Sequence, residues 1–554
     1  MSYPVLERIT KPEELRKLSL ADLLILVESL RSFIQTETSE KEGHIKSSLG
    51  VVELSIALHY HFNTPEDILI WDVGHQAYAH KVLTERKRDF ATNRKQGGIA
   101  GFTKRSESKY DPFGSGHSSA SISALAGFIK AAQLSHLQRK HIAVIGDGAL
   151  TGGQAFEALN FLGEEQSDCL IVFNDNQSSI DPNIGALQAR DSYRAWSEAL
   201  GFQYHSTESG NNLESLLGAL NHLSEIKGPL FWHVRTQKGL GYKAKNTAKT
   251  KTQKPSFQST FGTWALAALA ENPKLVVLSP AMLAGANLSA AKAKFPDRVI
   301  DVGIAEQHVV TMAAGLAAAG MKPLVHLYST FAQRAIDQII HDVALQSLGV
   351  TFVLDRAGYV GEDGPTHHGV FDQSLLMDIP NIRLGAPSGG RALMEMLDWA
   401  MSQSEGPVFL RYPKDSFDPE MDKLWRSYRP HWWHQSAKKV FISYGKIAEV
   451  VQSAAVQSGC GHLHIPIARP FPKGDVLEQL KNVEHLILVD ENPSAGSVHH
   501  NIAELIATGE LELNYQHITL AAEFMEHAGR SEQLKTAGLS LDHLLSLSQN
   551  SGDE

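Results

Sequence analysis

The sequence predicts an α/β fold made of three consecutive α/β domains with mostly parallel sheets. Short continuous apolar runs alternate with stretches of helical character, which is the pattern of parallel strands covered by helices on both faces. A chain of 554 residues is also too long for a single hydrophobic core. Strand and helix patterns alternate in three successive blocks, and we expect each block to form one domain.

The first block spans residues 1–242, and a helical stretch at residues 153–163 separates two of its apolar runs. Its predicted strands are residues 68–73, 141–145, 169–173 and 229–234. Residues 243–255 are polar and rich in lysine without hydrophobic periodicity, so we interpret them as a linker.

The second block spans residues 256–425, and an irregular stretch rich in Pro, Trp and His follows it. Its predicted strands are residues 275–278, 298–302, 323–327, 351–355, 382–384 and 408–411. The third block, residues 436–554, predicts strands at residues 440–443, 462–467 and 485–489. We expect this last domain to support assembly.

Composition excludes several classes of partner. The formal net charge is −10 and the isoelectric point is about 6.2, which disfavours a broad surface for nucleic acid or an anionic membrane. Only Cys169 and Cys460 are present, and Cys169 lies in a predicted buried strand, so a disulfide framework is not expected. The chain has no run of about 18 apolar residues, and its start lacks the layout of a signal peptide. These observations predict a soluble, cytoplasmic protein.

Polar side chains follow two neighbouring strands of the first block. Asp147 comes directly after one apolar run, and Asn176 follows the next. Ligands of parallel sheets bind at the carboxyl ends of strands, and Mg²⁺ prefers oxygen ligands together with phosphate oxygens. The pair therefore predicts a magnesium site that holds a diphosphate. The alternative is that Gly146-Asp147-Gly148 forms only a tight turn.

These two motifs resemble the thiamine diphosphate motif of the transketolase superfamily. Further segments narrow the resemblance to the 1-deoxy-D-xylulose-5-phosphate synthase family, of which this chain looks like a shortened, divergent member. The matching segments are residues 71–78, 101–108, 116–119, 304–308, 328–331 and 355–358. The resemblance runs from about Tyr3 and is weakest after about Ser436. It implies a transketolase-like fold and a homodimer.

The resemblance implies thiamine diphosphate and Mg²⁺ as cofactors. Glu306 matches the acid that bonds the aminopyrimidine and promotes loss of the thiazolium proton. Without the resemblance, a Glu at a predicted helix start would be read as a dipole partner. The implied cofactor contacts are His75, Gly116, His117, Ser118, Gly148, Ala149, Asn176, Tyr242, Glu306 and Phe331. The implied metal ligands are Asp147, Asn176 and Ser178.

The implied substrates are pyruvate and a phosphorylated aldehyde, D-glyceraldehyde 3-phosphate. Histidine suits proton transfer near neutral pH, and His44 and His367 match active-site histidines of the family. Arginine suits a phosphate dianion. The implied substrate contacts are Tyr328, Arg356, Asp363, His367 and Arg411. For histidines and arginines outside such motifs, a surface or structural role is the usual interpretation.

Several departures from the family pattern concern the acceptor side. The connection at residues 187–199 is short, and residues 208–212 replace an Asp-Gly-His element. Residues 243–255 contain no histidine, and residues 387–390 lack the usual acidic residue. Three hypotheses therefore stay open: the synthase itself, the same chemistry with another aldehyde or phosphosugar, and a paralogue that binds the cofactor without turnover.

Overall fold

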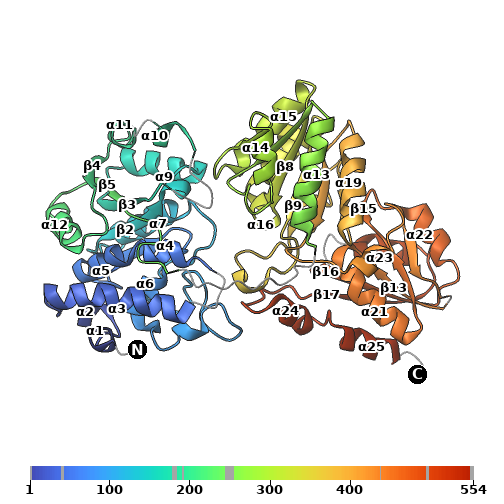
Figure 1. The fold of residues 1–554 in the computed structure, drawn as a ribbon, viewed down its shortest axis with the longest axis horizontal. Helices are drawn as coiled ribbons and strands as arrows, with labels where there is room; N and C mark the ends of the chain where they lie inside the picture. Colours follow the sequence, from blue (N-terminus) through green and yellow to red (C-terminus); the bar gives the residue numbers. More distant parts are fainter. Residues whose placement is uncertain are drawn as a thin grey trace. The chain divides into compact units, whose positions relative to one another are not determined.

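The computed structural model describes residues 3–38, 43–177, 184–189, 192–243, 255–436, 438–493 and 498–549. The chain divides into two compact units, Met1–Lys249 with Gly303–Ala305 and Thr250–Val302 with Glu306–Glu554 (Figure 1). Most of the predicted linker and Ser178 lie outside the described residues. Each unit is built on largely parallel sheets with helices on both faces, so the predicted α/β class is confirmed.

The first unit contains a five-stranded parallel sheet in the order β1-β2-β3-β5-β4. Its strands are β1 (Ile68–Trp71), β2 (His141–Gly146), β3 (Cys169–Asp175), β4 (Gln203–Thr207) and β5 (Pro229–Arg235). Its helices are α1 (Pro4–Glu7), α2 (Pro12–Leu15), α3 (Leu20–Thr38), α4 (Ile45–Leu49), α5 (Val52–His61), α6 (Tyr78–Lys81), α7 (Ser121–Leu134), α8 (Asp147–Leu150), α9 (Gly153–Glu164), α10 (Ala186–Ala189), α11 (Tyr193–Ala199) and α12 (Leu213–Leu223).

Both faces of this sheet are buried, because successive side chains of a strand point to opposite faces. In β2, Ile142 and Val144 join the core that α3, α5 and α12 cover. Ala143 and Ile145 join the core on the other face, beneath α7 and α9. This two-sided burial explains why the predicted strands read as continuous apolar runs.

The second unit contains two sheets. The seven-stranded sheet has the order β15-β10-β11-β9-β8-β6-β7, in which only β15 is antiparallel to its neighbour. Its strands are β6 (Leu275–Ser279), β7 (Val299–Asp301), β8 (Lys322–Tyr328), β9 (Thr351–Asp355), β10 (Arg383–Gly385), β11 (Val408–Tyr412) and β15 (Ile467–Arg469). Its helices include α13 (Phe257–Glu271), α14 (Ser289–Lys294), α15 (Glu306–Ala318), α16 (Ser329–Ala332), α17 (Ile336–Gln338), α18 (Asp372–Leu376), α19 (Gly390–Ser402) and α20 (Pro419–Asp422).

The third sheet has the order β12-β14-β13-β16-β17, with β12 antiparallel to β14. Its strands are β12 (His431–His434), β13 (Lys439–Ser443), β14 (Gly461–His464), β16 (His485–Pro493) and β17 (Asn514–Leu520). The helices of this part are α21 (Ala448–Ser458), α22 (Lys473–Leu480), α23 (Val498–Ala507), α24 (Arg530–Thr536) and α25 (Leu541–Gln549).

Two predictions for this part of the chain are wrong. The stretch interpreted as irregular contains β12. The single strand predicted at residues 462–467 is divided into β14 and β15 on either side of Pro466, and β15 joins the second sheet beside β10. One core cluster also includes Phe352 and Phe409 of the second sheet together with Ile442 and Leu488 of the third. The two sheets of this unit therefore share a hydrophobic core.

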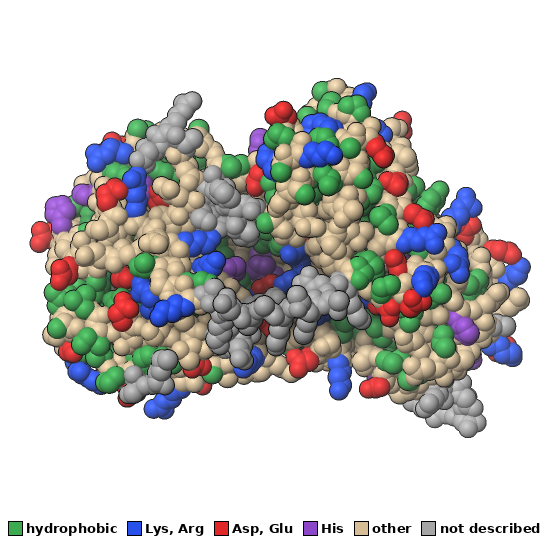
Figure 2. All heavy atoms as spheres, viewed as in Figure 1, with side chains coloured by type: hydrophobic (Ala, Val, Ile, Leu, Met, Phe, Trp, Pro, Cys, Tyr) green, Lys and Arg blue, Asp and Glu red, His purple; other side chains and the backbone are tan. Residues whose placement is uncertain are grey.

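On the face shown in Figure 2, Lys and Arg side chains are interspersed with Asp and Glu side chains. Among the described residues, no helix is both long enough and apolar enough to cross a membrane.

Candidate active site

The carboxyl ends of β2 and β3 bring Asp147 and Asn176 together. These strands are parallel neighbours, with Gly146 opposite Asn174. Asp147 is 3% exposed, and its carboxylate accepts hydrogen bonds from the Gly148 amide at 2.9 Å and the Asn176 amide at 3.2 Å. A carboxylate and an amide oxygen at one sheet edge form a donor set that suits Mg²⁺.

His44 and His75 lie side by side in the first unit. Their ring centroids are 5.6 Å apart, His44 preceding α4 and His75 following β1. Burial, reinforced by His44 and Lys238, lowers the pKa of His75 to about 3, so its ring is neutral. Its Nδ1 is buried, and within the described chain it has no hydrogen-bond partner. An orphaned buried nitrogen is expected where a ligand supplies the missing partner.

The segment Gly116-His117-Ser118 is held against the same edge. The Asp72 carboxylate at the end of β1 accepts the Ser119 amide at 2.8 Å and the Ser121 amide at 3.0 Å. The Ser119 hydroxyl donates to the Ala149 carbonyl at 2.6 Å. The backbone of residues 116–118 therefore lies close to the predicted contacts Gly148 and Ala149.

Tyr242 lies beside α4, where the Lys46 ammonium is 5.2 Å from its ring centroid. The Gly239 amide donates to the Lys46 carbonyl at 2.8 Å. Nearby, Arg94 stacks on Phe102 at 5.0 Å, and the ring centroid of Phe102 is 5.9 Å from that of His44. Arg94 is 2% exposed. The sequence did not single it out, because its proximity to His44 depends on the fold.

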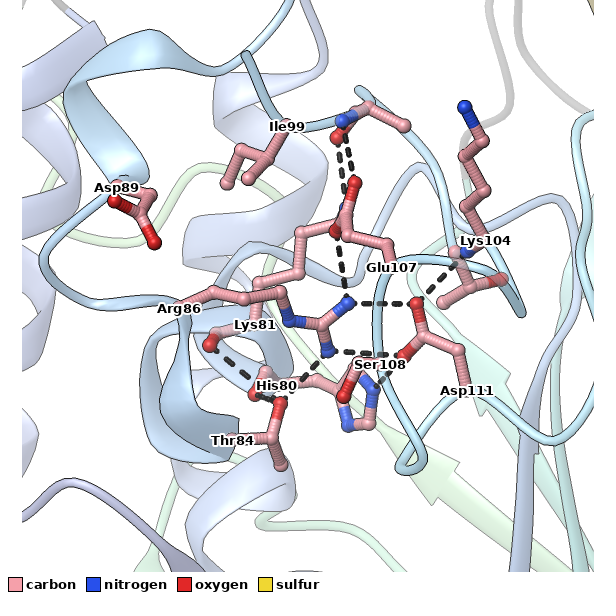
Figure 3. A network of polar contacts seen from close by, with 12 residues as sticks. His80, Lys81, Thr84, Arg86, Asp89, Ile99, Lys104, Glu107, Ser108 and Asp111 are labelled. Atoms are coloured by element: carbon pink, nitrogen blue, oxygen red, sulfur yellow. Dashed lines mark hydrogen bonds and ion pairs between the residues drawn. The ribbon is translucent and has the colours of Figure 1, made fainter.

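A buried charge network fixes residues 99–119, which we call the first loop (Figure 3). Arg86 bonds both oxygens of Asp111, at 2.6 and 2.9 Å, and Glu107 at 2.9 Å. Lys81 also bonds Glu107, at 2.5 Å, and His80 donates to Asp111 at 2.8 Å. The two carboxylates accept the amides of Ala100 and Lys104 in the loop, at 2.6 and 2.8 Å respectively. The network sets the path of the chain that leads to His117.

In the second unit, Glu306 is the first residue of α15 and is 6% exposed. Burial raises the pKa of its carboxyl group, although Arg334 opposes this with a guanidinium nitrogen 3.6 Å away. A carboxyl group whose protonated form is favoured can donate a hydrogen bond. This property fits the aminopyrimidine partner that the resemblance implies.

Aromatic rings connect the predicted residues Tyr328, Phe331 and His367. Tyr328 and Phe331 stack with centroids 5.5 Å apart, and the His367 ring meets Phe331 edge-on at 5.6 Å. The Arg356 guanidinium lies over the Tyr328 ring at 4.0 Å. The second sheet thus brings these four side chains into one cluster with an aromatic surface and a cation.

Arg411 lies on the opposite face of the second sheet from Tyr328. Tyr328, Asp355 and Tyr412 form one cross-strand row, whereas Arg411 stands opposite Leu354 in the next row. Its guanidinium donates to Asp372 at 2.8 Å and to the Gly369 carbonyl at 3.2 Å. Arg356 begins the connection after β9, and Arg411 bonds Gly369 later in the same connection. Their joint role in phosphate binding stays a prediction.

Asp363 and His367 lie in residues 358–369, which we call the second loop. Asp363 ends a single 3₁₀ turn at Gly361–Asp363. His367 follows after Gly364, and its Nδ1 is 2.8 Å from the Thr366 hydroxyl. Both predicted residues are therefore placed by the path of this loop.

Backbone strain marks the ends of three strands. Val73, Gln177 and Arg356 have positive φ values of 57°, 58° and 59°, directly or shortly after β1, β3 and β9. Non-glycine residues seldom adopt this conformation, and it is concentrated at functional sites. The positive φ values of these three residues could not be predicted from the sequence.

The chain is similar to known proteins. A family model described as 1-deoxy-D-xylulose-5-phosphate synthase matches residues 6–195, and the transketolase pyrimidine binding domain matches residues 253–419. A 1-deoxy-D-xylulose-5-phosphate synthase of Thioalkalivibrio sulfidiphilus is 38% identical, covering 98% of this chain and 95% of that protein. One of Pseudomonas aeruginosa is also 38% identical, with 97% and 95% covered. A solved transketolase from Leishmania mexicana aligns with a TM-score of 0.46 at 16% identity, covering 98% of this chain and 97% of that one. On the basis of the two curated relatives, the chain belongs to the 1-deoxy-D-xylulose-5-phosphate synthase family.

Proposed function

We propose that the protein decarboxylates pyruvate and transfers the remaining two-carbon unit to D-glyceraldehyde 3-phosphate, giving 1-deoxy-D-xylulose 5-phosphate. The observation that carries the proposal is the buried Glu306, whose raised pKa favours the protonated acid, close in sequence to the aromatic cluster around Phe331. The 38% identity to synthases over nearly the whole chain supports the same reaction.

Thiamine diphosphate, when bound, supplies a carbon that acts as nucleophile and electron sink. Asp147, Asn176 and Ser178 would hold Mg²⁺ for the diphosphate. His75, Tyr242 and the backbone of residues 116–118 and 148–149 line the cofactor. Glu306 would donate a hydrogen bond to the aminopyrimidine, and Phe331 would offer a ring face to it.

The substrate residues bind the acceptor and transfer protons to and from the reacting oxygens. Arg356 and Arg411 hold the phosphate of the acceptor with Tyr328, and Asp363 bonds its hydroxyl groups. His44 and His367 exchange protons with the reacting oxygens, because a neutral imidazole can serve as acid or base near pH 7. The proposal includes a homodimer in the cytoplasm.

A different aldehyde acceptor is the second candidate. Where relatives have an Asp-Gly-His element, Asn211 here accepts the Gln237 amide at 2.7 Å and donates to the Gly50 carbonyl at 2.9 Å. This asparagine ties the segment leading to Tyr242 to the end of α4, so the replaced element keeps an organising contact. A different side chain thus makes this contact, which favours testing acceptors beyond the expected one.

The test is release of carbon dioxide from pyruvate by the purified protein with thiamine diphosphate and Mg²⁺, with and without D-glyceraldehyde 3-phosphate. Product mass identifies the sugar. We expect acceptor-dependent release and a deoxypentulose phosphate. Preference for another aldehyde in an equimolar panel would establish the second candidate, and cofactor binding with no pyruvate consumption under any acceptor would establish a non-catalytic paralogue.

A further inference from the structure

The second loop is in close contact with the C-terminal domain of its own unit. Gly358 and Gly364 have φ values of +76° and +70°. A Cβ atom at Gly358 would lie 2.3 Å from the Glu491 carboxylate, and one at Gly364 would lie 2.1 Å from His527 Nδ1. Groups from the third domain therefore approach this loop so closely that only glycine fits at both positions.

Glu491 carries the first of these contacts. Its Oε1 accepts the Tyr359 amide at 2.9 Å, and its two oxygens accept a bidentate pair of bonds from Arg530, at 3.0 and 2.8 Å. Glu491 is 7% exposed, so its charge needs a partner. Arg530 supplies that partner, and its Nε is also 3.5 Å from Asp415, which follows β11.

Gln533 makes a further contact with the loop, at Gly361. Its side-chain oxygen accepts the Gly361 amide at 2.9 Å, and its amide nitrogen donates to the Gly361 carbonyl at 3.1 Å. Both backbone groups of this residue are thus bonded by one fully buried side chain. Because Gly361 begins the turn that ends at Asp363, these two hydrogen bonds fix the position of the turn.

Two histidines complete the attachment. His368 accepts the Val360 amide at 3.1 Å and donates to the Met525 carbonyl at 3.0 Å. His527 donates to the Glu362 carbonyl at 3.0 Å. The backbone before Asp363 and the residue after His367 are therefore both bonded to the segment that precedes α24.

We propose that the C-terminal domain positions the acceptor-binding loop, with Glu491, Arg530 and Gln533 as positioning residues for Asp363 and His367. We call these three side chains the C-terminal clamp. The inference rests on the proposed function, because it takes Asp363 and His367 as substrate contacts. Glu306 and Phe331 lie on α15 and α16 against the second sheet. Loss of the clamp therefore affects the acceptor more than the cofactor.

The test compares Arg530→Gln with Lys535→Gln in the full-length protein. Both variants remove one positive charge from α24, but Lys535 is exposed and only Arg530 bonds Glu491. In R530Q we expect faster hydrogen exchange in residues 358–369. Displacement of a reacting group by about 1 Å can cost up to about 100-fold, so we expect kcat/KM for the aldehyde to fall about tenfold or more. Thiamine diphosphate affinity and acceptor-free release of carbon dioxide should fall much less than kcat/KM for the aldehyde, since Glu306 and Phe331 lie outside the loop and are reached from it through the His367 ring. K535Q should match the wild type.

Each outcome decides the proposal. Unchanged exchange in the loop overturns the clamp, and faster exchange with an unchanged kcat/KM for the aldehyde overturns its positioning role. If hydrogen exchange also rises across β13 and β16, R530Q is misfolded. Gln533→Met then replaces it as the test variant, because it removes the two bonds to Gly361 and the bond to the Glu526 carbonyl without touching the ion pair. Acceptor constants are measured with the aldehyde that the wild type prefers, so a wrong choice of aldehyde is distinguishable from a wrong clamp. A wild type that uses no aldehyde refutes the proposed function and the positioning role together, while the exchange result still tests the clamp.

Discussion

The first and the second loop each carry a candidate histidine. The residues that bond to stabilise each loop are separated by very different distances along the chain. In the first loop, Arg86 and Glu107 are 21 positions apart, and His80 and Asp111 are 31 apart. In the second loop, Tyr359 and Glu491 are 132 positions apart, and Gly361 and Gln533 are 172 apart. The first loop is fixed by its own segment, whereas the second is fixed by residues of β16 and α24, far along the chain in the same unit.

The chemistry of the two attachments differs as well. The first uses a cluster of buried opposite charges that bond one another and the loop amides. The second uses one ion pair, one amide side chain and two histidines that bond the loop backbone directly. A change in the first loop should therefore act mainly on stability, and a change in the second mainly on the position of substrate residues.

The largest effect is expected from Glu306→Ala, which leaves both loops in place. General acid–base groups contribute about 10²- to 10⁴-fold, so kcat for pyruvate consumption should fall by about that factor. The structural reason is that Glu306 is a buried acid with a raised pKa. The measurement is carbon dioxide release at saturating cofactor, with exposed Glu271→Ala on α13 as the control. Normal turnover in E306A would refute the catalytic role assigned to Glu306.

Arg86→Ala should give the largest effect on stability. It leaves the buried carboxylates of Asp111 and Glu107 without a guanidinium, and breaking a buried ion pair costs about 3–5 kcal/mol. The unfolding transition of the first unit should shift to lower temperature in calorimetry, and residues 99–119 should exchange faster. The matched control is Arg88→Ala, an exposed neighbour. Equal stability of R86A and R88A would show that the network does not hold the first loop.

The sequence predicted the central strands of all three sheets and missed three edge strands. β4, β12 and β17 each lie at a sheet edge, and polar residues interrupt their apolar pattern, as in Gln203–Thr207. An edge strand buries less surface, so its sequence need not be apolar. The apolar run that ended at residue 467 was misread because Pro466, which lies between two strands of different sheets, was counted as part of one.

The candidate site was predictable to the extent that it follows strand ends. Asp147 and Asn176 came from two adjacent motifs, and their proximity follows from parallel pairing. The C-terminal clamp was not predictable, because Glu491 and Gln533 carry no local pattern that relates them to a loop more than 130 positions away. The same holds for Arg94, whose packing against Phe102 depends on the folded first unit. The C-terminal part of the chain, expected only to support assembly, thus bonds the loop that carries Asp363 and His367.

Asp147→Asn tests the edge of the first unit without disturbing the first loop. The change removes the carboxylate charge that Mg²⁺ prefers and keeps the shape of the side chain. The apparent dissociation constant for Mg²⁺, measured by calorimetry in the presence of thiamine diphosphate, should rise at least about tenfold, or about 1.4 kcal/mol. Asp168→Asn, an exposed residue just before β3, should behave as the wild type. An unchanged Mg²⁺ affinity in D147N would remove Asp147 from the metal site.

The smallest effect concerns pH and the third sheet, from which Glu491 reaches the second loop. His462 is buried between Gln452, at 2.8 Å, and Ser443, at 2.7 Å, and burial lowers its pKa from 6.5 to about 3. The unfolded chain therefore binds a proton below about pH 6.5 that the folded chain does not bind, so stability is lost as the pH falls.

Between pH 7 and pH 5.5 this histidine should cost the third sheet about 1 kcal/mol, because one pKa unit corresponds to about 1.4 kcal/mol. The free energy of opening of β13 and β14, taken from hydrogen exchange corrected for its intrinsic pH dependence, measures the loss. His462→Gln should weaken this dependence, with His464 of the same strand, whose pKa burial also lowers, supplying the remainder. His543→Gln, at an exposed residue of α25, should leave the dependence unchanged. Because Glu491 belongs to β16 of the same sheet, residues 358–369 should lose protection together with β14 as the pH falls. If hydrogen exchange in β14 becomes faster at low pH while exchange in residues 358–369 stays unchanged, the second loop does not depend on the third sheet for its order.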